Sequence, residues 1–175
     1  MYRQSLRTAL FVALACMMPL VASAQKVDVD YDKAVDFSKA RTYAWQTGQP
    51  VSNPLLHKRI ISAIDRQLAA KGWTKVEASP SAVLVYQAAV DEQKELSAWG
   101  SGPRWSGFGT ARVETILVGQ LVVDIYDASN AQLMWRGFVS DTVTDSTEKN
   151  ERKLNDAVAK LFKRFPPKAA VSSER

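Results

Sequence analysis

Residues 119–139 read GQLVVDIYDASNAQLMWRGFV, and this segment decides the fold class. Residues 120–127 are rich in apolar and β-branched side chains, and apolar residues alternate along 133–139. The residues between them, 128–131, are small or polar and are typical of a turn. Two β-type runs joined by a short turn predict a β-hairpin.

Two amphipathic helices are expected on either side of this hairpin in the sequence. The first is predicted over 54–71, with Asn53 as its N-cap and Pro54 at its first position. The second is capped by Ser146 or Thr147 and is expected to continue to the Pro166-Pro167 pair. Each has one apolar stripe at helical spacing: Leu56, Ile60, Ile64 and Leu68 in the first, and Leu154, Ala157, Val158, Leu161, Phe162 and Phe165 in the second.

Short β-type runs fill the rest of the chain. They are 27–31, 42–45, 73–76, 82–90 and 112–118. The charged residues 91–95 are interpreted as the exit from the strand 82–90, and Gly119 as a bulge or a point of close backbone approach. Because strands and helices do not alternate regularly, we predict an α+β fold, with a largely antiparallel β-sheet and two α-helices packed on one face. Phe37, Trp45, Trp73 and Trp135 are expected to be core residues.

The first 24 residues have the pattern of a Sec signal peptide. Arg3 and Arg7 form a positive n-region, residues 9–22 are almost entirely apolar, and Ala22-Ser23-Ala24 is a cleavage signal of the A-x-A type. The apolar run is too short to span a bilayer comfortably as a helix. We therefore expect cleavage before Gln25 and a periplasmic protein.

Cys16 offers an alternative, in which the protein is an outer-membrane lipoprotein anchored through this residue. The preceding residues are Ala13-Leu14-Ala15. A lipobox prefers leucine at the first of these positions and a small residue at the second, so only Ala15 fits. With cleavage before Gln25 the mature chain has no cysteine, which suits an oxidising compartment.

The amino-acid composition limits which classes of protein and of binding site are possible. An apolar share of 46% and a charged share of 23% are typical of a globular domain, expected here over 25–167, with 168–175 as a disordered tail. One cysteine excludes a disulfide framework, and one histidine excludes a histidine-rich metal site. The net charge of +5 falls to +3 without Arg3 and Arg7. A secreted, mildly basic domain is not expected to bind nucleic acid, whereas contact with a membrane stays open.

Four motifs, in order, carry a resemblance to a known family. They are Asp30-Tyr31-Asp32 with Asp36-Phe37-Ser38 and Thr42-Tyr43-Ala44-Trp45; Asn53-Pro54-Leu55 with Leu68-Ala69-Ala70-Lys71-Gly72-Trp73; Gly119-Gln120-Leu121-Val122-Val123-Asp124 with Asp127 and Trp135-Arg136-Gly137; and Ala157-Val158-Ala159-Lys160 with Phe165-Pro166-Pro167. On these residues the chain resembles a bacterial envelope family catalogued as a domain of unknown function, numbered forty-one thirty-six.

The resemblance covers about residues 26–167. It implies a secreted or lipid-anchored envelope protein of α+β fold, and it brings no catalytic residue with it. The sequence departs from the family at the lipobox and in the hairpin turn. Relatives often carry glycine or asparagine late in that turn, whereas here Asn130 comes one step earlier and Ala131 follows it.

Acidic residues near the hairpin, over about 120–141, offer a hydrolase as a second alternative, because paired carboxylates can perform acid–base chemistry. The candidates are Glu114, Asp124, Asp127 and Asp141. Arg112 and Arg136 explain them more simply as partners in cross-strand ion pairs. His57 has no second histidine or cysteine to join it and is interpreted as a surface residue.

A calcium site and a nucleotide site are also disfavoured. Asp28, Asp30, Asp32 and Asp36 alternate with apolar residues, which predicts a solvent-facing side of a strand; the glycine of an EF-hand loop is replaced by Lys33. The segment Gly100 to Trp105 lacks the third glycine of a dinucleotide-binding loop. We therefore expect no metal, no cofactor and no enzymatic activity.

The Gly/Trp-rich segment 97–110 is the best candidate for a binding site. It holds four of the eight glycines and shows no helical or strand periodicity, which predicts a long mobile loop or an irregular strand extension. Exposed aromatic residues suit contacts with a glycan, a lipid or a protein of the cell envelope. The candidate binding residues are Trp99, Arg104, Trp105 and Phe108. In the other interpretation, this loop folds back over the open face of the sheet.

Overall fold

The computed structural model of the chain describes residues 25–46, 51–99 and 110–166, without the side chains of 95–99 and 110–112. The expected signal peptide and C-terminal tail lie outside these residues, as does Cys16. Within the described part of the chain, no helix is both long and apolar enough to cross a membrane.

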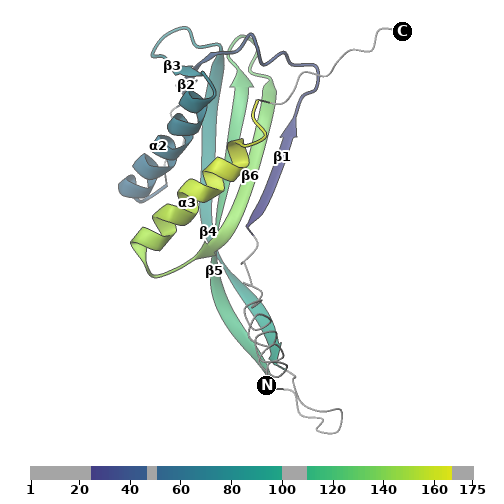
Figure 1. Ribbon diagram of the computed structural model, residues 1–175, viewed down its shortest axis with the longest axis vertical. Helices are drawn as coiled ribbons and strands as arrows, with labels where there is room; N and C mark the ends of the chain where they lie inside the picture. The colour runs from purple at the N-terminus through teal and green to yellow at the C-terminus, as the bar shows by residue number, and fades with distance from the viewer. Residues whose placement is uncertain (1–24, 47–50, 100–109, 167–175) are drawn as a thin grey trace, which may run out of the picture.

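One six-stranded sheet forms the centre of the structure, in the order β1-β6-β5-β4-β2-β3 (Figure 1). Its strands are β1 (Lys26–Tyr31), β2 (Thr42–Trp45), β3 (Thr74–Lys75), β4 (Ala82–Trp99), β5 (Thr110–Asp127) and β6 (Leu133–Val143). β2 runs parallel to β3 and β4, and the other neighbours are antiparallel. Both helices lie on the same face of the sheet. The predicted α+β fold is confirmed.

The first helix, α2 (Pro54–Ala70), begins as predicted. The Asn53 side chain accepts hydrogen bonds from the backbone N–H groups of Leu55 and Leu56, which satisfies two free donors of the first turn. At the other end, Gly72 adopts a φ of +78°, a left-handed conformation that favours glycine after a helix.

The second helix, α3 (Thr147–Phe162), is capped by Ser146 and ends earlier than the sequence predicted. The chain leaves the helix before the prolines, yet Phe165 still reaches the core. Its ring lies 5.2 Å from that of Trp73 and 5.3 Å from that of Trp135, measured between centroids. Burial of this aromatic ring therefore does not require a continuous helix up to Pro166.

The hydrophobic core lies between the two helices and the sheet. Phe37, Trp73 and Trp135 are buried, and Trp45 is half-buried against the core, as the sequence predicted. Asp65 of α2 ties the helix to β2, because it accepts hydrogen bonds of 2.8 Å from the Tyr43 hydroxyl and from the indole N–H of Trp45. Burial, followed by this contact with Asp65, raises the pKa of Tyr43.

One strand prediction is wrong, and of the two alternatives for Gly119 the structure shows the second. β4 does not end at residue 90 but continues through the charged residues 91–95 to Trp99, because β5 pairs with it residue by residue over that whole length. β5 passes through Gly119 without a bulge, and the register shift lies between Ile125 and Tyr126 instead. Gly119 allows the Val143 side chain of β6 to approach β5 closely, since a Cβ at residue 119 would lie 3.1 Å from Cγ2 of Val143.

In the turn between β5 and β6, the left-handed position is occupied by Ala131. Ala131 adopts a φ of 57°, a left-handed conformation that side-chain-bearing residues rarely take, and its N–H donates to the carbonyl of Asp127 at 2.9 Å. The turn therefore places an alanine where glycine or asparagine is usually found.

Candidate interaction surface

The hairpin of β4 and β5 projects beyond the rest of the domain (Figure 1). β6 pairs with β5 only as far as Val143, which lies opposite Leu117. Beyond that point, residues 93–99 of β4 pair with residues 110–116 of β5 alone. We call this two-stranded segment the β-arm.

The β-arm stands alone because β6 turns away to begin α3. Asn150, in the first turns of α3, binds the chain just after β6 through both polar atoms of its side-chain amide. Its Oδ1 accepts from the Thr144 N–H at 2.9 Å, and its Nδ2 donates to the Thr144 carbonyl at 2.6 Å. Since the chain is fixed in this turn, no third strand accompanies the arm among the described residues.

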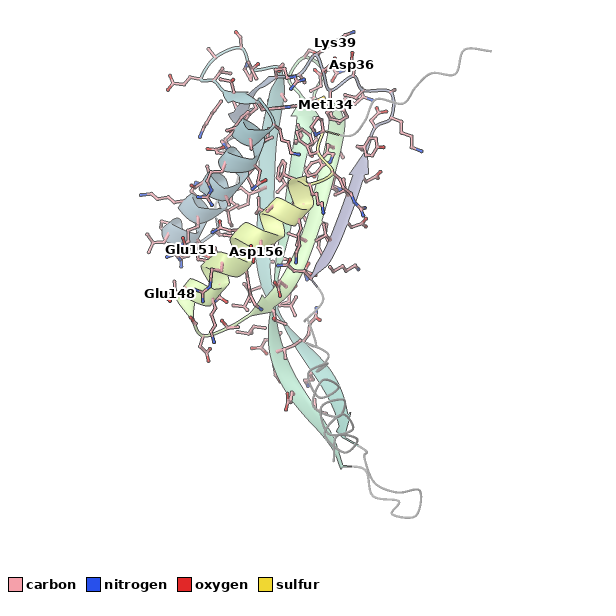
Figure 2. The ribbon with its side chains drawn as sticks, in the orientation of Figure 1. Asp36, Lys39, Met134, Glu148, Glu151 and Asp156 are labelled. Carbon is pink, nitrogen blue, oxygen red and sulfur yellow. The ribbon has the colours of Figure 1, made fainter. Side chains whose placement is uncertain are left out.

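Apolar side chains are exposed on the face of the hairpin that continues the core. Val90 is 55% exposed, Val113 56% and Leu117 40%, although residues on the same face nearer the helices are buried. Figure 2 shows that the side chains drawn on the projecting part extend into open space. On the opposite face, Asp91 accepts a 2.8 Å hydrogen bond from the side-chain amide of Gln120.

Of the four binding residues predicted from the sequence, Trp99 lies at the end of this arm. Trp99 is the last residue of β4, and Ser97 and Thr110 also lie in the two strands, so the expected loop is shorter than 97–110. Arg104, Trp105 and Phe108 lie outside the described residues. The β-arm was not predicted from the sequence. The signal that could have indicated it is the pair of β-type segments of equal length on either side of the glycines.

The acidic residues near the hairpin do not gather into one site. Asp124 is 3% exposed and pairs across the strands with Arg136, which donates to its two carboxylate oxygens at 2.7 Å each. This contact confirms the predicted ion pair, and the hydrogen bonds with Asp124 raise the pKa of Arg136. Asp141 lies on the other face of the sheet, because strand side chains alternate and Asp124 and Asp141 occupy positions of opposite orientation.

Asp141 belongs to a second polar cluster beneath α3. It accepts a 2.6 Å hydrogen bond from the side-chain amide of Gln25 and lies 3.3 Å from Nζ of Lys153. Burial by itself raises the pKa of Asp141, but the hydrogen bonds from Gln25 and Lys153 outweigh it, so the pKa is lowered. The cluster joins the start of β1, the end of β6 and α3.

Stability is therefore expected to depend on the charge of Asp141. Because its folded-state pKa is lowered, its contribution is complete above the ordinary pKa of aspartate, about 3.9, and is lost as the pH falls through the lower folded value. We expect Asp141→Asn to cost about 1–2 kcal/mol at pH 7 and progressively less in acid. Urea unfolding of both proteins between pH 7 and pH 2 measures this difference. A difference that stays constant over that range would contradict the assignment.

His57 is half-buried, so its interpretation as a surface residue needs correction. Its Nδ1 lies 2.6 Å from the hydroxyl of Tyr86, and the two rings are 5.7 Å apart between centroids. Burial raises the pKa of Tyr86. This contact fixes the start of α2 on β4 at Tyr86. An open hollow lies along the surface of α2. It is lined by His57, Lys58, Ile61, Ser62, Asp65, Arg66 and Ala69.

The N-terminal aspartates lie on the solvent side of the fold. Asp28 and Asp30 of β1 are exposed, and so is Asp36 in the following turn, where Lys39 lies near it (Figure 2). Within the described residues, no group of three or more potential ligand side chains is placed to hold a metal ion.

Comparison with protein families now identifies the chain. The family model described as "Domain of unknown function (DUF4136)" matches residues 27–167, which is most of the sequence. The chain belongs to the DUF4136 family. The match begins in β1 and ends just after Phe165, so the sheet, both helices and the β-arm all lie within the DUF4136 domain. A search of curated proteins finds no significant match.

Solved structures are similar to this DUF4136 domain at low sequence identity. A PDZ domain protein from Parabacteroides distasonis matches with a TM-score of 0.57 and 19% identity over 83% of the chain. The chain spans only 36% of that protein. Two crystal forms of a PelC dodecamer from Paraburkholderia phytofirmans match with TM-scores of 0.48 and 0.47, at 16% and 15% identity, over 79% of the chain and 94% of PelC.

Proposed function

We propose that this chain is a cell-envelope binding module that contacts its partner through the β-arm and performs no catalysis of its own. One observation carries the proposal. Beyond Leu117, the described strands of the β-arm pair only with each other and stand clear of the domain. The partner would be an envelope protein, a glycan or a lipid, which agrees with the tryptophans and the arginine in the segment 97–110.

The energetics of the arm support this proposal. A two-stranded hairpin has little stability in water, because it buries no apolar face of its own. Here the exposed Val90, Val113 and Leu117 continue the core face past the helices. Covering these side chains with a partner would remove apolar area from water at about 25 cal/mol per Å². The arm therefore gains stability when it binds.

The state of the acidic residues supports the non-catalytic part of the proposal. Asp124 is already bonded to Arg136, and Asp141 to Gln25 and Lys153. Neither carboxylate is free to act on a substrate without breaking these contacts. The periplasmic location rests on the leader pattern of residues 1–24, with the lipoprotein anchored at Cys16 as its alternative.

Shortening the arm tests the proposal. Gln93 and Ile116 are cross-strand partners whose backbone groups face each other, so residues 94–115 can be replaced by a two-residue Asn-Gly turn without disturbing the remaining pairs. We expect the shortened protein to keep its melting temperature within a few degrees and to lose its crosslinks to envelope components in cells. Circular dichroism and crosslinking of whole cells measure the two properties.

Leu55→Ser is the matched control, because Leu55 is a similarly exposed apolar residue on α2, away from the arm. The control should keep the crosslinked products. If the folded, shortened protein keeps them as well, the arm is not the binding surface. Metabolic labelling with a fatty-acid analogue, compared between the wild type and Cys16→Ser, separates the lipoprotein from a protein cleaved before Gln25.

A further inference from the structure

The outer edge of β4 is a strand edge open to pairing. β2 pairs with β4 only through Ala82, Val83 and Leu84, and its last contact is the Gln46 N–H bonded to the Leu84 carbonyl. Past that point, no strand of the described chain lies against this edge. Free strand edges are templates for pairing with another chain.

The backbone orientation shows which residues of this edge can form hydrogen bonds. The Leu84 carbonyl points toward β2, whereas the Ser81 carbonyl points toward β5 and accepts from the Ala128 N–H. Because orientation alternates along a strand, even-numbered residues of β4 direct their N–H and C=O groups to the open edge. Among the even-numbered residues of β4 whose side chains the structure describes, Val90, Glu92 and Lys94 are exposed.

We propose that two copies of this chain form a symmetric dimer by antiparallel pairing of their β4 edges, centred on Gln93. This inference goes beyond the proposed function, since it requires no other partner and leaves both faces of the β-arm uncovered. A two-fold axis through the Gln93 pair sets even residues opposite even residues, as the hydrogen bonds require. The two core faces then lie on the same side of one continuous sheet.

The charges select this register on the core face. With Gln93 opposite Gln93, Glu92 lies opposite Lys94 of the second copy, twice by symmetry, and Val90 lies opposite position 96, a leucine. A shift of the centre by one residue puts Glu92 opposite Glu92 or Lys94 opposite Lys94, and like charges in direct opposition are destabilising. On the other face, Asp91 lies opposite position 95, a glutamate, so Asp91→Asn should tighten the dimer.

The helices leave room for this pairing. α2 meets β4 at Tyr86 through His57, and its first turn lies at that level of the strand. The proposed ladder starts at Ala88 and ends at position 98 of the second copy. In Figure 1 the β-arm extends past the ends of both helices.

A single cysteine tests the geometry. Gln93 belongs to a pair without mutual hydrogen bonds, for which Cα atoms lie about 4.5 Å apart, within the range of a disulfide. In a Cys16→Ser background, which removes the one native cysteine, Gln93→Cys should form a covalent dimer on mild oxidation. Gln87→Cys, exposed on the same face, should not. Failure of Gln93→Cys to crosslink, or equal crosslinking of Gln87→Cys, would refute the register.

Charge exchange tests the same register without a crosslink. Lys94→Glu turns both favourable pairs into repulsive ones, so we expect the dimer affinity to fall roughly tenfold in sedimentation equilibrium. Glu92→Lys with Lys94→Glu restores opposite charges and should restore the affinity. A wild-type protein that stays monomeric at all concentrations, or a double variant no tighter than the single one, overturns the proposal. Neither result bears on whether the arm binds another partner.

Discussion

Gly137→Ala is expected to destabilise the domain by about 3 kcal/mol, because the added methyl group has no room in the core. Gly137 lies in β6 directly beneath α3. A Cβ atom there would lie 2.7 Å from Cδ1 and 2.9 Å from Cγ of Leu161, and would also overlap the ring of Trp135. Both neighbours are fully buried, so neither can move without disturbing the core. Urea unfolding at neutral pH measures the loss.

Gly119→Ala provides the matched control, because it adds the same methyl group to the neighbouring strand. The nearest atom to a Cβ at this position is Cγ2 of Val143 at 3.1 Å, and Val143 is only half-buried. We expect a change of less than about 1 kcal/mol. Equal effects at the two glycines would show that the approach of α3 to β6 is not what requires Gly137.

Arg136→Ala is expected to cost about 2–3 kcal/mol, because it leaves the Asp124 carboxylate buried without its two charge-assisted hydrogen bonds. The arginine side chain is half-exposed and the aspartate almost fully buried, so the aspartate is the partner that depends on the pair. The Tyr126 hydroxyl, 3.4 Å from Asp124, is too distant to compensate. Thermal unfolding of the variant measures the loss.

A double-mutant cycle decides whether this loss belongs to the pair. Removing both side chains, as Asp124→Ala with Arg136→Ala, eliminates the unpaired charge. The double variant should therefore be less destabilised than the sum of the two single variants. Additive losses would mean that each side chain acts through separate packing contacts.

The apolar patterns predicted the helices and the sheet because they report burial. The stripe from Leu154 to Phe165 illustrates both the strength and the limit of this signal. Phe165 falls at the next helical position and is buried, yet the helix has ended at Phe162. The spacing showed which side chains meet the core, but it could not show whether the backbone between them was helical.

The β-arm escaped sequence reasoning for the complementary reason. Residues 91–94 are exposed on both faces of β4, so no alternation of apolar and polar residues marks them as a strand. They are extended because β5 supplies hydrogen-bond partners from a distant part of the chain. Pairing of this kind is a property of two segments, and neither carries it in its own pattern.

The contacts of the acidic residues near the hairpin were predicted only in part. The sequence correctly predicted a cross-strand ion pair for Asp124, because Arg136 follows it across a short turn. It gave no indication that Asp141 would meet Gln25, since that contact spans most of the chain and depends on β1 lying beside β6. Long-range contacts of this kind require the topology to be known first.

The equal lengths of the two arm strands have a consequence for how such domains diversify. Each strand extends by about 3.3 Å per residue, so the seven residues of 93–99 carry the arm's end about 23 Å from the body. Adding two residues to each strand would lengthen this reach by roughly 6.6 Å and keep every side chain on its face. The distance that the domain spans can thus be adjusted in even steps, independently of its core.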